Sequence, residues 1–397
     1  MVKVNQTILR WARETAGINI DDACHKLGIN ETRELTARER LLALEDGIVE
    51  PSRPLLVKMA KQYHRPLITF YMDKPPIKGE RGQDFRSLPD SYSKENIALV
   101  DAIIRNVIVR QSIVRAALED EEDVESVSFV GSAKISDGVI KLVDLIYQII
   151  ELDINKFYKR PSPNEAFSLL RTHVESAGVF VLLIGDLGSH HSDVDIKAFR
   201  GFALADLYAP FIIINDNDSK AAWSFTLIHE LTHILLGQTG VSGTSNDFDI
   251  ERFCNNVAGK FLLPDDELLK LKITHNLDRD ELMKRISTFS NNRNVSSSMV
   301  AYNLYLSGEI SKDVWIELNN TYRDLWKEHR DDKRIQKNKG EGGPDYYIIK
   351  KHRLGNGITR FTQQMLLGGM ITTTEAGKVL GLKPKNVQKL FESQGYQ

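Results

Sequence analysis

Five consecutive residues, His229-Glu230-Leu231-Thr232-His233, carry the most informative chemistry in this sequence. They lie within Trp223–Gly237, where the spacing of apolar residues predicts a helix. Side chains four residues apart lie on one face of a helix, so the imidazoles of His229 and His233 can reach one metal ion. Zinc accepts histidine nitrogens, and a catalytic zinc keeps three protein ligands and a water. Glu230 stands beside the pair as a general base for that water, so the spacing predicts metal-assisted hydrolysis.

A third metal ligand is predicted on a second helix further along the chain. Glu251 and Asn255 are one helical turn apart there, so we expect Glu251 to bind the metal and Asn255 to orient a ligand histidine. Two histidines and a glutamate form the ligand set of thermolysin-type zinc peptidases. The rival ligands are Asp247, Asp249 and Cys254. The alternative for Glu251 is an exposed carboxylate that the helix dipole favours at a helix start.

The residue that stabilises a developing oxyanion stays open among several candidates. These are His173, His190, His191, His275 and several tyrosines, although a lone histidine is more often structural. His190 and His191 lie in the polar stretch 188–195 between two predicted strands, which indicates a loop.

The elements that must position these side chains are mostly helical. We expect strands at 179–185, 201–205 and 211–215 and helices near 93–118, 138–158 and 163–177. Further helices are expected at 264–271, 278–289, 296–307 and 311–328. The predicted fold class is therefore α+β, mostly helical, with a small sheet beside the motif helix. The strand at 211–215 is either a core strand or an edge that binds substrate backbone.

The motif segment resembles the ImmA/IrrE-type metallopeptidases, which are small gluzincin-like enzymes. The resemblance is carried by HELTHILLG, by E-x-x-x-N-x-x-A and LLP after it, and by FRGF and APFIIIN before it. It covers roughly residues 85–310 and departs from the family at Cys254, where alanine is more common. It implies a zinc enzyme that cleaves a transcriptional repressor at a specific site, in a stress- or phage-related response.

Residues 1–75 resemble an XRE-type helix-turn-helix domain of the kind often fused to such peptidases. The resemblance is carried by LRWARETAG, LGIN, LLALEDG and PSRPLLVKMAKQYHRPL. It implies operator DNA binding, for which the candidate residues are Arg33, Arg38, Arg40 and Arg53. Glu31, Glu34 and Glu39 balance the charge of the same region, so a helical module for protein contact or dimerisation is the alternative.

We predict a peptidase domain at 76–327, a flexible linker at 328–344 rich in Lys, Arg, Asp and Gly, and a small helical accessory domain at 345–397. Within the last segment, 373–383 resembles a second helix-turn-helix-like unit. Basic residues give this segment a possible nucleic-acid role, with a solvated accessory domain as the alternative: Lys350, Lys351, Arg353, Lys383, Lys385 and Lys389.

Composition excludes several classes of function. The 397 residues carry a net charge of −2, so no global field recruits nucleic acid. The two cysteines, Cys24 and Cys254, are far apart in sequence and predict no disulfide, which favours the cytoplasm. No signal peptide and no apolar run long enough for a membrane span are predicted.

Two functions remain. The first is a zinc-dependent site-specific endopeptidase whose protein substrate is a helix-turn-helix repressor. The second is a DNA-binding transcriptional regulator or antitoxin, in which the peptidase-like domain holds a partner such as a toxin encoded nearby. The intact Glu230 favours the enzyme, because a silent domain has no need of a base beside the metal.

Overall fold

The computed structural model describes residues 3–76, 94–121, 124–188, 192–241, 248–273, 278–339 and 345–393. The chain forms two compact units. The first comprises Met1–Asn106 and Asp186–Ala198, and the second comprises Val107–Gly185 and Phe199–Gln397. The long helix α5 (Lys94–Glu119) contributes to both. The domain boundaries that we predicted from the sequence stay a prediction.

Four helices build the N-terminal part of the first unit: α1 (Gln6–Thr15), α2 (Ile20–Leu27), α3 (Ala37–Glu45) and α4 (Arg53–Gln62), followed by the 3-10 turn η1 (Leu67–Tyr71). Side-chain caps start the first three, and α3 begins with a full capping box between Thr36 and Glu39. The core consists of apolar residues from all four helices, among them Leu9, Leu41 and Met59.

A small mixed sheet lies in the second unit. Its strands are β1 (Phe180–Leu183), β2 (Gly201–Leu204), β3 (Phe211–Ile214) and β4 (Gly240–Val241), in the order β1-β3-β2-β4. β1 runs parallel to β3, whereas β2 is antiparallel to both β3 and β4. All four residues of β2 and of β3 are buried, as expected for strands whose sequence is continuously apolar. The three predicted strands are confirmed, and β3 is a central strand; the two-residue β4 was not predicted.

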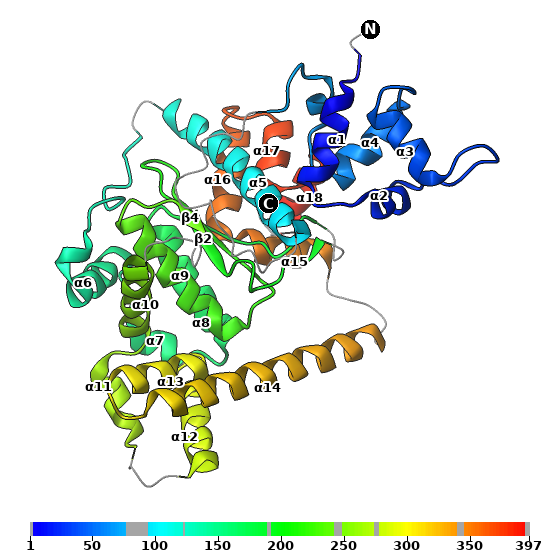
Figure 1. Ribbon diagram of the computed structural model, residues 1–397. Coiled ribbons are helices and arrows are strands. Elements are labelled where there is room, and N and C mark those ends of the chain that lie inside the picture. Colours follow the sequence, from blue (N-terminus) through cyan, green and yellow to red (C-terminus); the bar gives the residue numbers. More distant parts are fainter. Residues whose placement is uncertain are drawn as a thin grey trace. The chain divides into compact units, whose positions relative to one another are not determined.

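Helices that pack on the sheet and on one another position the candidate site. The motif helix is α9 (Lys220–Leu235), which packs on β2 and β3, on α8 (Pro163–Ser176) and on α10 (Phe248–Leu262) (Figure 1). The 3-10 turn η2 (Ile135–Asp137), α6 (Val139–Ile150) and the short α7 (Ile154–Tyr158) precede α8, and α6 packs on α10. The last carbonyls of α10, from Phe261 and Leu262, accept hydrogen bonds from Tyr147 and Tyr158 at 2.6 Å and 2.9 Å. These bonds satisfy the end of α10 and hold it in place.

The helices after the site extend the core. They are α11 (Asp265–Leu268), η4 (Leu269–Leu271), α12 (Arg279–Asn291), α13 (Ser297–Leu306) and α14 (Lys312–Lys339). The helix α14 runs well into the segment 328–344 that we predicted as a flexible linker. The reason lies in the sequence, because the helix-breaking residues of that segment begin only at Gly340 and the residues before it are good helix formers.

The C-terminal helices belong to the second unit, where they pack on α8 and β1. They are α15 (Tyr346–Leu354), α16 (Asn356–Leu367), α17 (Thr373–Leu380), the 3-10 turn η5 (Pro384–Asn386) and α18 (Val387–Glu392). Buried Arg171 on α8 donates to the carbonyl oxygens of His352 and Arg353, at 2.7 Å and 3.1 Å. Glu175 accepts from the backbone N–H groups of Asn356 and Gly357 at 3.2 Å and 3.0 Å. The C-terminal segment is therefore anchored to α8 through hydrogen bonds of Arg171 and Glu175.

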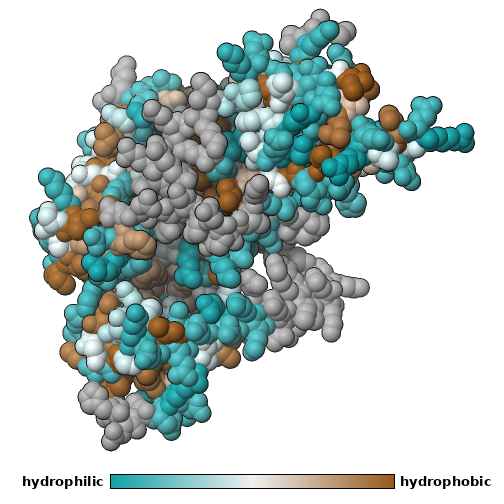
Figure 2. All heavy atoms as spheres, in the orientation of Figure 1, coloured by the Kyte–Doolittle hydropathy of each residue, from teal (hydrophilic) through white to brown (hydrophobic). Residues whose placement is uncertain are grey.

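The surface carries both hydrophobic and hydrophilic residues. Figure 2 shows hydrophobic residues scattered among hydrophilic ones on the face that it draws. Isolated exposed side chains of this kind, such as Ile48 and Ile68, are normal for a globular protein. Among the described residues, no helix has both the length and the apolar character needed to cross a bilayer.

Candidate metal centre

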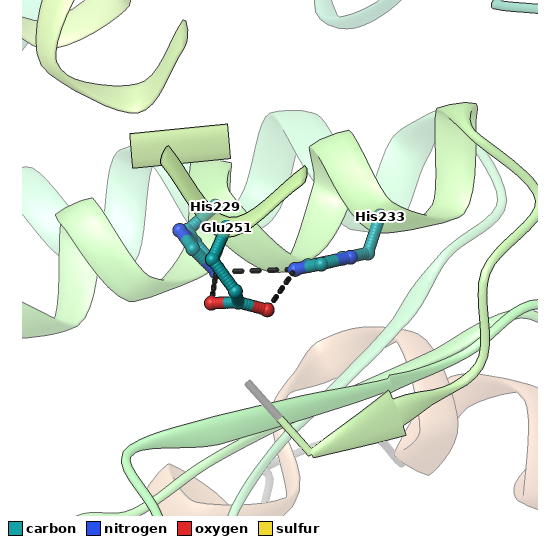
Figure 3. Close-up of side chains that lie close together, drawn as sticks. All are labelled: His229, His233 and Glu251. Carbon is teal, nitrogen blue, oxygen red and sulfur yellow. Dashed lines mark hydrogen bonds and ion pairs between the residues drawn. The ribbon is translucent and has the colours of Figure 1, made fainter. Parts of the chain in front are cut away.

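The side chains of His229, His233 and Glu251 converge between α9 and α10 (Figure 3). Their ligand atoms all lie within 4.8 Å of one another. The two histidine Nε2 atoms are 3.2 Å apart. The carboxylate oxygens of Glu251 lie 3.4 Å from Nε2 of His229 and 3.3 Å from Nε2 of His233. The structure thus brings together the three residues that we predicted as metal ligands.

The spacing of these atoms fits a metal ion. Ligands held at about 2.0–2.1 Å around a tetrahedral zinc lie about 3.3–3.4 Å from one another. The two Nε2 atoms, 3.2 Å apart, come close to that separation, and each lies 3.3–3.4 Å from a different oxygen of Glu251. Charge-assisted hydrogen bonds are commonly shorter, at about 2.7–2.9 Å. Both histidines are buried, and Nδ1 of His229 has no hydrogen-bond partner among the described residues. The donor set is two imidazoles and one carboxylate, which suits zinc and related divalent ions.

The electrostatics of the cluster favour bound positive charge. Burial raises the pKa of Glu251, but contacts with both histidines and their charge outweigh it and hold that pKa well below its usual range. Burial lowers the pKa of His233, but contacts with Cys254 and Glu251 and the charge of Glu230 raise that pKa well above its ordinary value. Negative groups therefore surround a position where a cation can be held.

Glu230 is fully buried and lies against strand β2. A Cβ atom at Gly201 would come within 2.8 Å of Oε1 of Glu230 and 2.6 Å of Cγ2 of Thr226. Glycine is therefore required at position 201, because any side chain there would displace the carboxylate or the helix that carries it. Gly201 was part of the FRGF segment in the sequence, although its steric reason becomes visible only when β2 and α9 pack together.

Gln238 is a functional contact that sequence reasoning missed. Its Oε1 lies 3.0 Å from Nδ1 of His233, and its backbone N–H donates to the carbonyl of His233 at 2.9 Å. Gly237, with φ +69°, makes this turn possible at the end of α9. When Gln238 accepts a hydrogen bond from Nδ1, Nε2 of His233 is left as the atom that faces the other ligands. In the sequence, Gly237 indicated that the helix ends there and that a turn brings the next residue back towards it.

The three rival metal ligands, Asp247, Asp249 and Cys254, differ in what the structure shows of them. Asp249 is exposed and pairs with Arg252 at 3.0 Å, away from the cluster, whereas Asp247 lies outside the described residues. Cys254 is buried and in contact with His233, and burial raises the pKa of its thiol. Asn255 is half-buried in α10 and its side chain makes no hydrogen bond within the described part of the chain, so its orienting role stays a prediction.

The candidates for oxyanion stabilisation are placed only in part. His190, His191 and His275 lie outside the described residues. The ring nitrogen Nδ1 of His173 lies 2.8 Å from the carbonyl of Ile150, which is a structural contact at the end of α6.

The four arginines predicted to bind DNA lie in the N-terminal helical unit. Arg33, Arg38 and Arg53 are exposed, and Arg38 lies 3.8 Å from a carboxylate oxygen of Asp21. Arg40 donates to the carbonyl of Asn30 at 2.5 Å. Their accessibility is compatible with the predicted contact, which stays a prediction.

Comparison with known proteins identifies the class of the central segment. Residues 184–305 match the family model described as the IrrE N-terminal-like domain, which is a peptidase family. The match includes all three clustered ligands and Glu230, covers less than half of the chain and does not extend to the N-terminal helices. It supports the resemblance to the ImmA/IrrE-type metallopeptidases over this segment. No curated protein and no solved structure gives a comparable match.

Proposed function

We propose that this protein is a zinc-dependent, site-specific endopeptidase that regulates transcription by cleaving a helix-turn-helix repressor, in a stress- or phage-related response. The observation that carries the proposal is the His229–His233–Glu251 cluster, whose ligand atoms all lie within 4.8 Å of one another, with Glu230 next to His229 on the same buried helix. The family match to residues 184–305 supports it. Operator DNA at the N-terminal arginines and a cytoplasmic location belong to the same proposal.

The residues divide the chemistry between them. When bound, zinc polarises a scissile carbonyl and lowers the pKa of a water towards about 7. His229, His233 and Glu251 hold the ion, and Gln238 fixes the ring of His233. Glu230 accepts the proton of the attacking water and passes it to the leaving amine nitrogen. Burial of Glu230 against β2 fixes its position, so no reorganisation is needed before the proton moves.

The alternative is a regulator or antitoxin whose peptidase-like segment holds a partner without cutting it. The feature that favours this alternative is the set of exposed arginines on the N-terminal helices, which are suited to contact DNA phosphates. The two functions differ in whether Glu230 is needed.

The deciding experiment co-expresses products of neighbouring genes with the wild type or with Glu230→Gln and measures their masses. We expect a discrete cleavage with the wild type only, because general-base catalysis contributes about 10²–10⁴-fold. Glu230→Gln should retain zinc, since it removes no ligand. Cleavage by Glu230→Gln at the wild-type rate would sink the assignment of the base. An intact partner that co-purifies with both proteins would instead support the alternative.

A further inference from the structure

The C-terminal helices carry an excess of positive charge on a chain that is otherwise acidic. Residues 345–393 contain eight Lys or Arg and three Asp or Glu, a net charge of +5. Because the whole chain carries −2, the remainder carries −7. The excess is thus local to one segment, and it lies outside the residues that match the peptidase family.

The segment 372–392 folds as two helical elements joined by a tight turn. The first is α17, which starts at a capping box between Thr372 and Glu375. It ends at Gly381, with φ +62°, and the chain continues through η5 directly into α18. A Cβ atom at Gly377 would lie 2.9 Å from the carbonyl oxygen of Leu382, so the turn packs closely on α17. Two helices joined by a short, glycine-containing turn form the arrangement of a helix-turn-helix motif.

The second helical element, 384–392, has one buried and one exposed face. Val387, Leu390 and Phe391 are buried. Exposed polar residues occupy the spacing i, i+3, i+4 and i+7, which is one face of a helix: Lys385, Gln388, Lys389 and Glu392. Lys378 and Lys383 are also exposed, on α17 and in the turn. We call Lys378, Lys383, Lys385 and Lys389 the C-terminal lysine patch.

No carboxylate neutralises the part of this patch that lies in the turn and the second element. Within the described residues, Lys383, Lys385 and Lys389 take part in no ion pair. Two of the four N-terminal arginines differ, because Arg38 lies near Asp21 and Arg40 is held by the carbonyl of Asn30. Glu392, at the end of the exposed face, is the one acidic residue on it.

We propose that the C-terminal lysine patch binds double-stranded DNA, with the exposed face of residues 385–392 turned towards the major groove. Lysines that meet phosphates supply affinity, and glutamine and lysine side chains are suited to base edges. Single-stranded nucleic acid is recognised by stacking on aromatic side chains, whereas Phe391, the aromatic residue of this second element, is buried. Because α15 and α16 are anchored to α8, this DNA contact belongs to the second unit, whereas the N-terminal arginines belong to the first.

The test measures binding of the full-length protein to a fluorescent mixed-sequence DNA duplex across a series of salt concentrations. We compare the wild type with Lys385→Glu/Lys389→Glu. A control with the same change in net charge reverses two exposed lysines on α6 and α7, Lys141→Glu/Lys156→Glu. A third variant, Arg33→Glu/Arg38→Glu, reports the N-terminal contribution.

Reversal of the patch should weaken binding at least tenfold near 0.15 M salt and reduce the slope of log affinity against log salt by about 1.8, for two lost phosphate contacts. The control should stay within about twofold of the wild type. Because Lys385 and Lys389 are exposed, the fold should persist, and Lys385→Gln/Lys389→Gln should weaken binding in the same direction. Three results would overturn the proposal: wild-type affinity in the patch variant, no duplex binding by the wild type at low salt, or tighter binding of single-stranded RNA than of the duplex.

Discussion

Two regions of this molecule bury charged groups to a similar depth and use them differently. In the N-terminal unit, Arg13 donates to the two carboxylate oxygens of Glu45 at 2.7 Å and 2.9 Å. Between α9 and α10, His229, His233 and Glu251 face one another at 3.2–3.4 Å. The first set matches donors to acceptors, and Arg13 also donates to the carbonyl of Ile18 at 3.2 Å. The second set gathers ligand atoms of three residues within 4.8 Å of one another, at separations longer than those of the Arg13–Glu45 hydrogen bonds.

The comparison teaches that burial of charge alone does not identify a functional site. Arg13 and Glu45 are both less than a tenth exposed, as are His229 and His233. What separates the two regions is whether the buried groups satisfy one another. Substitutions in the first region should therefore change stability, and substitutions in the second should change metal binding.

The largest effect is expected for His233→Ala, which removes one of three ligands. We expect zinc binding to fall below detection after gel filtration, because the two remaining ligands do not hold the ion as a chelating set. The measurement is zinc content per chain by elemental analysis. Glu45→Ala is the matched substitution of a buried charged group and should retain the wild-type zinc content. Equal zinc content in wild type and His233→Ala would show that the cluster is not the metal centre.

The second prediction concerns the stability that the buried Arg13–Glu45 ion pair gives to the N-terminal unit. Glu45→Ala leaves the buried guanidinium of Arg13 without its partner, and such a loss costs about 3–5 kcal/mol. Amide hydrogen exchange of the full-length protein, followed by mass spectrometry, should show faster exchange throughout α1–α4. Arg38→Ala, which removes an exposed side chain 3.8 Å from Asp21, should change local stability by less than about 0.5 kcal/mol. Unchanged protection of α1 and α3 in Glu45→Ala would contradict a stabilising role for the pair.

The parts of the metal centre that sequence reasoning predicted are those with local signals. His229, Glu230 and His233 share one helix, and the spacing of Glu251 follows from a second helix with its own apolar periodicity. The strands β1, β2 and β3 were recognisable as short apolar runs bounded by turn residues.

The parts that were missed depend on contacts between distant residues. β4 is two residues long and exists because it pairs with β2. The contact between the C-terminal segment and α8 was not predicted, because Arg171 donates to backbone carbonyls about 180 positions later in the sequence. No periodicity carries such information, since it arises only when the chain has folded. The extension of α14 to Lys339 was missed for a different reason, because charged residues were given more weight than the absence of glycine and proline.

The smallest predicted effect is on zinc affinity and concerns Gln238, which contacts the ligand His233. The side chain of Gln238 reaches the site through Nδ1 of His233, at 3.0 Å. Loss of such an orienting partner typically weakens metal affinity by about 10–100-fold. We therefore expect Gln238→Ala to bind zinc with affinity reduced by that factor, measured by competition with a chromogenic chelator.

The conservative variant Gln238→Glu separates positioning from packing. Glutamate keeps an acceptor for Nδ1–H, and a carboxylate is a common partner of zinc-bound histidine, so affinity should return to the wild-type level or above. The backbone bond from residue 238 to the carbonyl of His233 is present in either variant, so the turn after Gly237 should persist in both. If Gln238→Ala and Gln238→Glu weaken zinc binding equally, Gln238 acts through packing of the turn and not through the imidazole. If neither changes affinity, the ring of His233 is held by α9 and Glu251 alone.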